Sequence, residues 1–165
     1  MYEKSIELLN RAVRSELTAV HQYMYFHFQL DDQGYDLLSS MFKRVAIAEM
    51  GHVEQLAERV LFLKGEITME VDAEVKPVHD VEKILEMACE MEQASVRDYN
   101  LWANECSANA DSVSKKIFEA LVVDEEGHYD QFDNELDKVK QFGDRFLALQ
   151  SIERSKNMAS GTAVD

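Results

Sequence analysis

The 165-residue sequence is poor in residues that interrupt helices, with one proline and six glycines. Proline breaks helical hydrogen bonding and interior glycine destabilises a helix, so their scarcity favours long helices. The two cysteines, Cys89 and Cys106, have no metal-binding or redox spacing, which argues against a disulfide framework. Neither a membrane-length apolar run nor the apolar core of a signal peptide is present. We therefore expect a soluble, cytoplasmic protein.

Basic residues are also scarce. The chain has 17 Lys and Arg residues against 32 Asp and Glu residues, a formal net charge of −15. This balance argues against nucleic acid and anionic membranes as partners and leaves cations as natural ones. The length suits one domain with a core of its own.

Polar and glycine-containing clusters divide the chain into helical tracts. Residues 64–79 include Pro77 and have no helical period, so we expect a long connection there, followed by Asp80 as a helix N-cap. The pattern predicts an all-α four-helix bundle with one long crossover and a short fifth helix, "RFLALQSI", in a domain of residues 1–154. Residues 155–165 are expected to form a flexible tail. The four long tracts cover residues 3–30, residues 37–63, Asp80 to about Glu105, and about Ser112 to Gln141.

Each long tract places one glutamate on its apolar face, and two tracts add a histidine three residues later. A lone buried carboxylate costs several kcal/mol unless a partner compensates for it. In a helix, residues i and i+3 share a face, so a glutamate and a histidine from one turn can bind one metal ion. The inward residues are Glu16, Glu49, His52, Glu92, Glu125 and His128.

These residues form an internal repeat. An interval of 33 residues separates Glu16 from Glu49, and the same interval separates Glu92 from Glu125. A shift of 76 residues superposes the two halves and also relates the histidines. Four carboxylates would repel one another unless cations neutralised them, and oxygen and nitrogen ligands suit iron or manganese better than structural zinc. The alternative is a bundle with buried, hydrogen-bonded Glu and His pairs and no metal.

The sequence resembles the bacterioferritins over nearly its whole length. The resemblance implies a ferritin-like bundle with an intrasubunit ferroxidase centre of two iron ions, bridged by Glu49 and Glu125. It also implies that Tyr23 forms a hydrogen bond near the site, although core packing would equally explain that residue. The catalytic and metal-binding residues would be the six inward residues named above. The segments that carry the resemblance are "SELTAVHQY", "IAEMGHVEQLAERVLFLKG", "DVEKILEMACEME", "VVDEEGHYDQFDNEL" and "FGDRFLALQ".

Met50 follows Glu49 directly and therefore points about 100° away from the site. In bacterioferritins, the methionine at this place is a haem ligand shared by two subunits, which implies one haem per two subunits on a two-fold axis. The alternative is a methionine at an ordinary packing contact. Residues on neighbouring helical positions could line the porphyrin: Leu17, Val20, Met24 and Ile47.

Some positions depart from the family pattern. Arg44 and Ala48 replace a His and an Asp that serve an inner-surface iron site in some members, so we do not expect that site. Gln131 replaces a Trp, so an electron-transfer role does not carry over to it. Three further histidines match no ligand position and are expected to be surface or locally hydrogen-bonded residues: His21, His27 and His79.

The resemblance implies an iron-storage ferroxidase that oxidises Fe(II) with dioxygen or hydrogen peroxide. It also implies a shell of twenty-four subunits built from two-fold dimers, with an electron-donor protein for iron release. Three alternatives remain open. A rubrerythrin-like peroxidase or oxidase is disfavoured because the CxxC pairs of a rubredoxin module are missing. The others are a twelve-subunit DNA-protecting ferritin and a helical bundle that binds metal without storing it.

Overall fold

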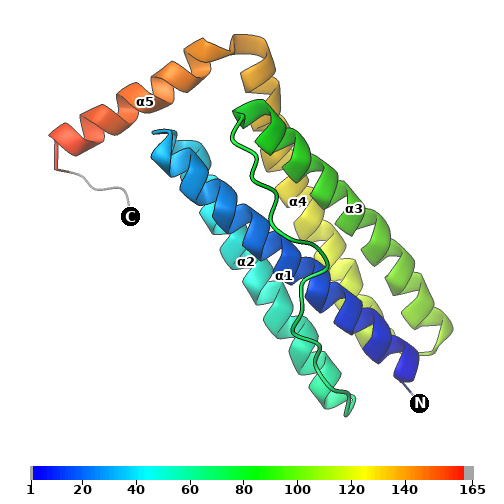
Figure 1. Cartoon of the computed structure of the whole chain (residues 1–165). Helices are drawn as coiled ribbons and strands as arrows, with labels where there is room; N and C mark the ends of the chain where they lie inside the picture. The colour runs from blue at the N-terminus through cyan, green and yellow to red at the C-terminus, as the bar shows by residue number, and fades with distance from the viewer. Residues whose placement is uncertain (1, 162–165) are drawn as a thin grey trace.

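The computed structural model describes residues 2–161, which form helices without any strand. Four long helices and one shorter helix match the predicted all-α fold class, and the bounds of the four long helices agree with the predicted tracts to within a few residues (Figure 1). No helix in this range is long and apolar enough to cross a membrane. The helices are α1 (Glu3–Asp32), α2 (Asp36–Phe62), α3 (Val81–Ala108), α4 (Ser112–Phe142) and α5 (Asp144–Ala159).

The bundle consists of two helix pairs. Helix α1 packs along α2, and α3 packs along α4, each pair joined by a short turn (Figure 1). The connection between α2 and α3 contains neither helix nor strand and runs along the bundle from one end to the other. It is the long crossover that the sequence predicts.

A polar stripe on α1 holds the crossover in place. Residues 10, 14, 18 and 22 lie four apart on one face of the helix, and each bonds to the crossover backbone or to a crossover side chain. Asn10 bonds to the backbone of residues 66 and 68, each at 2.8 Å. Arg14 pairs with Asp72 at 3.0 Å, and Thr18 Oγ1 accepts from the Asp72 backbone N–H at 2.9 Å. Gln22 exchanges two bonds with the backbone of residue 76.

Helices α3 and α4 both begin at an aspartate cap. Asp80 accepts a hydrogen bond from the backbone N–H of Lys83 at 3.0 Å, as predicted. Asp111 caps α4 through the N–H of Ser114 at 3.1 Å and also accepts from Arg59 of α2 at 2.7 Å. This buried ion pair fixes the start of α4 against the end of α2.

Helix α5 differs from the prediction. It extends to Ala159, so residues 155–159 are helical where the sequence analysis expects the tail to begin. Gly143, with φ of +54°, makes the turn between α4 and α5, a conformation that favours glycine. Arg154 then bonds to the backbone carbonyl of Asp31 and pairs with Asp36 at 3.4 Å, which attaches the second half of α5 to the α1–α2 turn. Residues 162–165 of the predicted tail lie outside the described residues.

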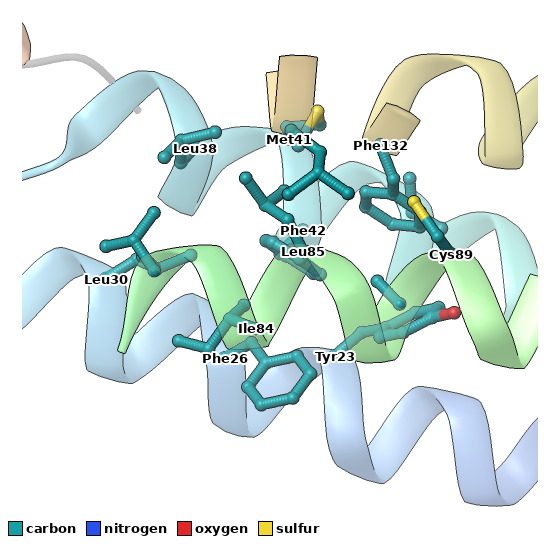
Figure 2. Packing of buried hydrophobic residues seen from close by; sticks show 14 of the residues in the cluster. Tyr23, Phe26, Leu30, Leu38, Met41, Phe42, Ile84, Leu85, Cys89 and Phe132 are labelled. Atoms are coloured by element: carbon teal, nitrogen blue, oxygen red, sulfur yellow. The ribbon is translucent and has the colours of Figure 1, made fainter. Parts of the chain in front are cut away.

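The core is divided into two hydrophobic clusters, one toward each end of the bundle. Figure 2 shows the first, where Tyr23 and Phe26 of α1 pack with Phe42 of α2, Leu85 of α3 and Phe132 of α4. The second cluster consists of buried apolar residues from all four long helices: Leu8, Leu9, Ala12, Val13 and Leu17 of α1, Val53, Leu56 and Val60 of α2, Tyr99, Trp102, Ala103 and Cys106 of α3, and Phe118 and Leu121 of α4. On α2, α3 and α4 the predicted site residues fall between the two clusters, and on α1 Glu16 lies near the border. The site therefore occupies the middle of the bundle.

Candidate metal centre

All six predicted site residues meet in this middle layer, and each is between 1% and 8% exposed. They form two overlapping groups whose potential ligand atoms lie within 4.8 Å of one another. Both groups share the same two glutamates, which is the arrangement expected when two carboxylates bridge two metal ions. The groups are Glu16, Glu49, His52 and Glu125, and Glu49, Glu92, Glu125 and His128.

The distances show how the two central carboxylates divide their oxygens. Glu49 places one oxygen 2.8 Å from Nδ1 of His52 and the other 3.0 Å from Nδ1 of His128. Glu125 does the same, at 3.1 Å from His52 and 3.4 Å from His128. The imidazole rings lie nearly parallel, with centroids 5.9 Å apart. Each central glutamate thus faces both histidines, and the site has two halves, one around His52 and one around His128.

The other two glutamates, the terminal glutamates Glu16 and Glu92, each approach the histidine of one half only. Glu16 Oε2 lies 3.5 Å from Nδ1 of His52, and Glu92 Oε2 lies 3.8 Å from Nδ1 of His128. Despite these close approaches, Nδ1 of both histidines, both oxygens of Glu49 and one oxygen each of Glu92 and Glu125 are buried and form no hydrogen bond of acceptable geometry. Such unsatisfied groups are costly unless something else binds them. Their convergence fits two divalent cations, and iron or manganese suits the donor set.

The pKa values of the terminal carboxylates are shifted in the opposite direction from those of the central carboxylates. Burial, and then repulsion from Glu49 and Glu125, raises the pKa of Glu16 well above its usual range. Burial and the contact with Glu125 raise the pKa of Glu92 in the same way. Burial also works against the charged form of Glu49, but the contacts with His128 and His52 outweigh it and lower its pKa. Burial likewise opposes the charged form of Glu125, but the contacts with His128 and His52 lower its pKa, so the central pair is the more readily ionised.

The pKa values of both histidines are raised, which is opposite to the shift of Glu49. Burial lowers the pKa of His128, but its contacts with Glu125 and Glu49 dominate and raise it to about 9. For His52, contacts with Glu125, Glu16 and Glu49 likewise outweigh burial and raise the pKa. When both imidazoles are charged and both terminal glutamates are protonated, the six side chains have no net charge. Protons thus supply the positive charge that two metal ions would bring.

Two buried tyrosines hold the terminal glutamates. The Tyr23 hydroxyl donates to Glu92 Oε1, as the resemblance implied, and the Tyr99 hydroxyl donates to Glu16 Oε1. In each case the other oxygen faces the histidine of the same half. Tyr99 is not among the residues predicted for the site, although the shift of 76 residues that relates the ligands also relates it to Tyr23.

His52 has one further contact, with a residue that no sequence pattern indicated. Its Nε2 donates to Oδ2 of Asp124 at 3.3 Å, on the side of the ring opposite the site. Asp124 is 56% exposed and immediately precedes Glu125. It therefore links the His52 half of the site to the surface of α4.

The remaining predicted residues lie outside the centre. Met50 is on the outer face of α2 with 45% of its side chain exposed, and Ile47 beside it is also exposed. His27 bonds to Ser39, His79 bonds to Tyr25, and His21 is exposed, so these three histidines have the local or surface places that we expected.

A cavity of about 170 Å³ leads toward the centre between α1 and α3. Glu49, Glu92 and Tyr23 line it from the core, and Asp72 of the crossover and Asp98 of α3 line it nearer the surface. Hydroxyl groups from both helices lie between: Ser15, Thr18 and Ser95.

Known proteins share this architecture. The ferritin-like domain family matches residues 6–142. The chain is 37% identical to the bacterioferritin of Desulfovibrio desulfuricans over 145 residues, 88% of this chain and 81% of that protein. The chain belongs to the bacterioferritins. It is also 35% identical to the Rhodobacter capsulatus bacterioferritin, over 88% of this chain and 91% of that protein.

Two solved bacterioferritins superpose closely. The Desulfovibrio desulfuricans structure, which describes a di-iron site in different catalytic states, has a TM-score of 0.88 at 36% identity and covers 90% of this chain and 86% of that one. The Rhodobacter capsulatus structure has a metal-free dinuclear site and haem iron in a crystallographic special position. Its TM-score is 0.85 at 32% identity, with 90% and 92% of the two chains covered. The ferritin-type bundle predicted from the sequence is therefore confirmed.

Proposed function

We propose that the protein is an iron-storage ferroxidase that oxidises Fe(II) at the six-residue centre and stores the Fe(III) product. The observation that carries this proposal is the set of converging, unsatisfied carboxylate and imidazole atoms in two overlapping groups. The solved Desulfovibrio relative, with its di-iron site, supports iron as the metal.

The six side chains would divide the work of holding two Fe(II) ions. Glu49 and Glu125 each offer one oxygen to each half, so they would bridge the two ions and set the distance between them. Glu16 with His52 and Glu92 with His128 would complete the two ends. Tyr23 and Tyr99 engage one oxygen of each terminal carboxylate, which would leave the other oxygen available to bind iron.

The chemistry requires an external oxidant. Two Fe(II) ions give up two electrons, and dioxygen takes up these electrons and two protons to form hydrogen peroxide. Hydrogen peroxide as the oxidant would take the same two electrons and two protons and yield two water molecules. The protein's part is to bind both Fe(II) ions together in a dry, acidic layer where the positive charge that develops on iron is stabilised.

The cavity between α1 and α3 would supply the route to the centre. Asp72 and Asp98 on its surface side would attract Fe(II), in keeping with the net charge of −15. The hydroxyl groups between the surface and Glu92 offer oxygen ligands along the way.

We also propose haem at Met50, with one haem per two subunits. Met50 lies exposed beside Ile47 on the outside of α2, where a second copy of the chain could bring the same residue to the other side of an iron atom. A thioether is a haem-iron ligand known from cytochromes. The haem would supply electron transfer for release of stored iron, accepting electrons from a donor protein.

The assembly proposed for storage is a shell of twenty-four subunits built from two-fold dimers. Exposed apolar residues on the bundle surface favour association: Phe28, Leu37, Ile47, Leu61 and Phe62 are each more than half exposed in the single chain. Two buried free cysteines are in keeping with a cytoplasmic location.

The test is Fe(II) oxidation by iron-free protein. Two Fe(II) per subunit should oxidise rapidly, and further Fe(II) should be mineralised more slowly in the assembled shell. Glu125→Ala and His128→Ala should lose the rapid phase while keeping the helical content and the assembly size. Rapid oxidation that survives in both variants would rule out the six-residue centre as the ferroxidase site.

A further inference from the structure

The two halves of the centre are related by a shift of 76 residues, and the relation extends beyond the ligands. The terminal glutamates, the central glutamates, the histidines and the tyrosines each form a pair at this interval. Asp124 breaks the relation, because the residue 76 positions earlier is Ala48. Asp124 precedes one central glutamate, and Ala48 precedes the other.

Because of this difference, the two histidines differ in their hydrogen bonding. Asp124 accepts a hydrogen bond from Nε2 of His52 at 3.3 Å. A carboxylate can only accept here, so the proton of a neutral His52 stays on Nε2 and the lone pair of Nδ1 faces the centre. An acceptor behind a ligating histidine fixes the orientation of the ring and makes the imidazole a stronger ligand.

His128 has no such support. Its ion-pair contacts all run from Nδ1 to glutamates of the centre, and within residues 2–161 no hydrogen bond or ion pair reaches its Nε2. The methyl group of Ala48, at the position related to Asp124, cannot accept one. The two histidines are therefore similar on the side that faces the centre and different on the side that faces away.

Asp124 is not engaged elsewhere. In the described part of the chain, its carboxylate pairs with no lysine or arginine, and His52 is its ion-pair partner. The side chain of Asp124 is 56% exposed and lies behind His52, close to one half of the centre.

We propose that Asp124 makes the two metal positions unequal, so that the His52 half fills first and binds the more tightly. The inference rests on the proposed function, since it concerns the same centre. Asp124 is a positioning residue here, because it acts on the metal through His52. The His128 half, with its ring held by Nδ1 contacts alone, is the weaker position.

Co(II) binding to the iron-free protein tests the proposal without relying on oxidation. The visible d–d absorption of Co(II) reports binding, and we expect two Co(II) per subunit in two resolved steps. Asp124→Ala should weaken the tighter step by about 10- to 100-fold, the usual effect of removing such an acceptor. Ala48→Asp should strengthen the weaker step and bring the two steps together.

The matched control is Asp130→Ala, which removes the same charge from an exposed position on the same helix. Its titration should match that of the wild-type protein. A crystal of the wild-type protein with one equivalent of Co(II) should show anomalous density at the Glu16–His52 position, and Asp124→Ala should spread that density over both positions.

The outcomes separate this inference from the proposed function. Two-step binding that is unchanged in Asp124→Ala, or equal density at both positions in the wild-type crystal, would overturn the inference and leave the ferroxidase centre in place. If the wild-type protein bound no Co(II), both would fail.

Discussion

The Tyr99 hydroxyl of α3 donates a hydrogen bond to Glu16 of α1, and the Tyr23 hydroxyl of α1 donates one to Glu92 of α3. The two bonds cross between the same helices in opposite directions. They are the main polar links between α1 and α3 at the level of the centre, and they bind the two helix pairs together through the terminal ligands.

Tyr99→Phe and Tyr23→Phe should therefore have similar effects. Each change leaves a buried carboxylate oxygen without a donor, which costs about 1–3 kcal/mol of stability in the metal-free protein. Each should also weaken metal binding in the half that has lost its hydrogen bond. Thermal unfolding and Co(II) titration would check both. If only Tyr23→Phe lost stability and metal affinity, the tyrosine–glutamate hydrogen bonds of the two halves would not be equivalent.

Glu92→Gln should stabilise the metal-free protein while damaging the centre. Burial and nearby carboxylates raise the pKa of Glu92, so at neutral pH its charged form opposes folding. Glutamine keeps an oxygen that can accept from Tyr23 and removes the charge, and we expect a gain of about 0.5–2 kcal/mol. Unfolding in the presence of a metal chelator measures the gain in stability of the metal-free protein. The impaired metal binding is measured as the loss of the extra stability that Fe(II) or Co(II) gives to the wild-type protein.

Asp111 makes a pH-dependent contribution to stability. Burial acts to raise its pKa, but hydrogen bonds from Ser114 and Arg59 outweigh burial and lower it below the ordinary 3.8. A lowered folded-state pKa means that the contribution is present above the unfolded-state pKa and is lost as the pH falls through the folded-state value. The stability difference between wild type and Asp111→Asn should be constant near neutrality and shrink below about pH 4. A difference that persists unchanged at pH 3 would contradict this account.

Asp111→Ala should cost more than the asparagine variant. It removes the cap of α4 and leaves Arg59 buried without its partner, a loss of about 3–5 kcal/mol. Ser114→Ala, which removes only a hydroxyl group that bonds to Arg59 at 3.0 Å, is the milder comparison. Chemical denaturation measures the free energy of unfolding of the three variants and so ranks their losses of stability.

Access through the α1–α3 cavity should depend on charge. Asp72→Asn with Asp98→Asn should slow Fe(II) oxidation severalfold at low ionic strength without changing how many Fe(II) ions bind at equilibrium. The difference from wild type should diminish as salt is added, because exposed charges are screened within about 10 Å at 0.1 M. Stopped-flow kinetics at several salt concentrations measures this effect, with Asp130→Asn combined with Asp137→Asn, two exposed changes on α4, as the control for net charge. Equal rates at low salt would exclude this cavity as the main route.

Met50→Leu should remove haem without affecting the ferroxidase centre. Leucine keeps the apolar surface but has no sulfur to bind iron. The purified wild-type protein should show a Soret band at one haem per two subunits, and the variant should lack it while oxidising Fe(II) at the wild-type rate. A Soret band in the variant would assign the haem to another ligand.

Several features could be read from local patterns in the sequence. The scarcity of proline and glycine indicated long helices, and the apolar periodicity indicated which face of each helix is buried. The helix bounds, the long crossover and the Asp80 cap follow from such local rules. The six inward residues were identifiable because polar residues on an apolar face are costly and because the pattern occurs twice. Helix α5 extends beyond the short helix that local patterns predict, and Arg154 within it bonds to the α1–α2 turn, more than a hundred residues away in the chain.

The four helices, their buried faces and the repeat that places one carboxylate on each helix follow from residue type and spacing within single helices, so the amino-acid sequence is enough to predict them. The packed bundle was needed to see how the oxygens of Glu49 and Glu125 divide between the two histidines. It also shows that Tyr99 engages Glu16, that Asp124 supports one histidine alone, and that a cavity reaches the centre from beneath the crossover. These features depend on the rotation and height of each helix relative to the others, which packing between distant segments sets.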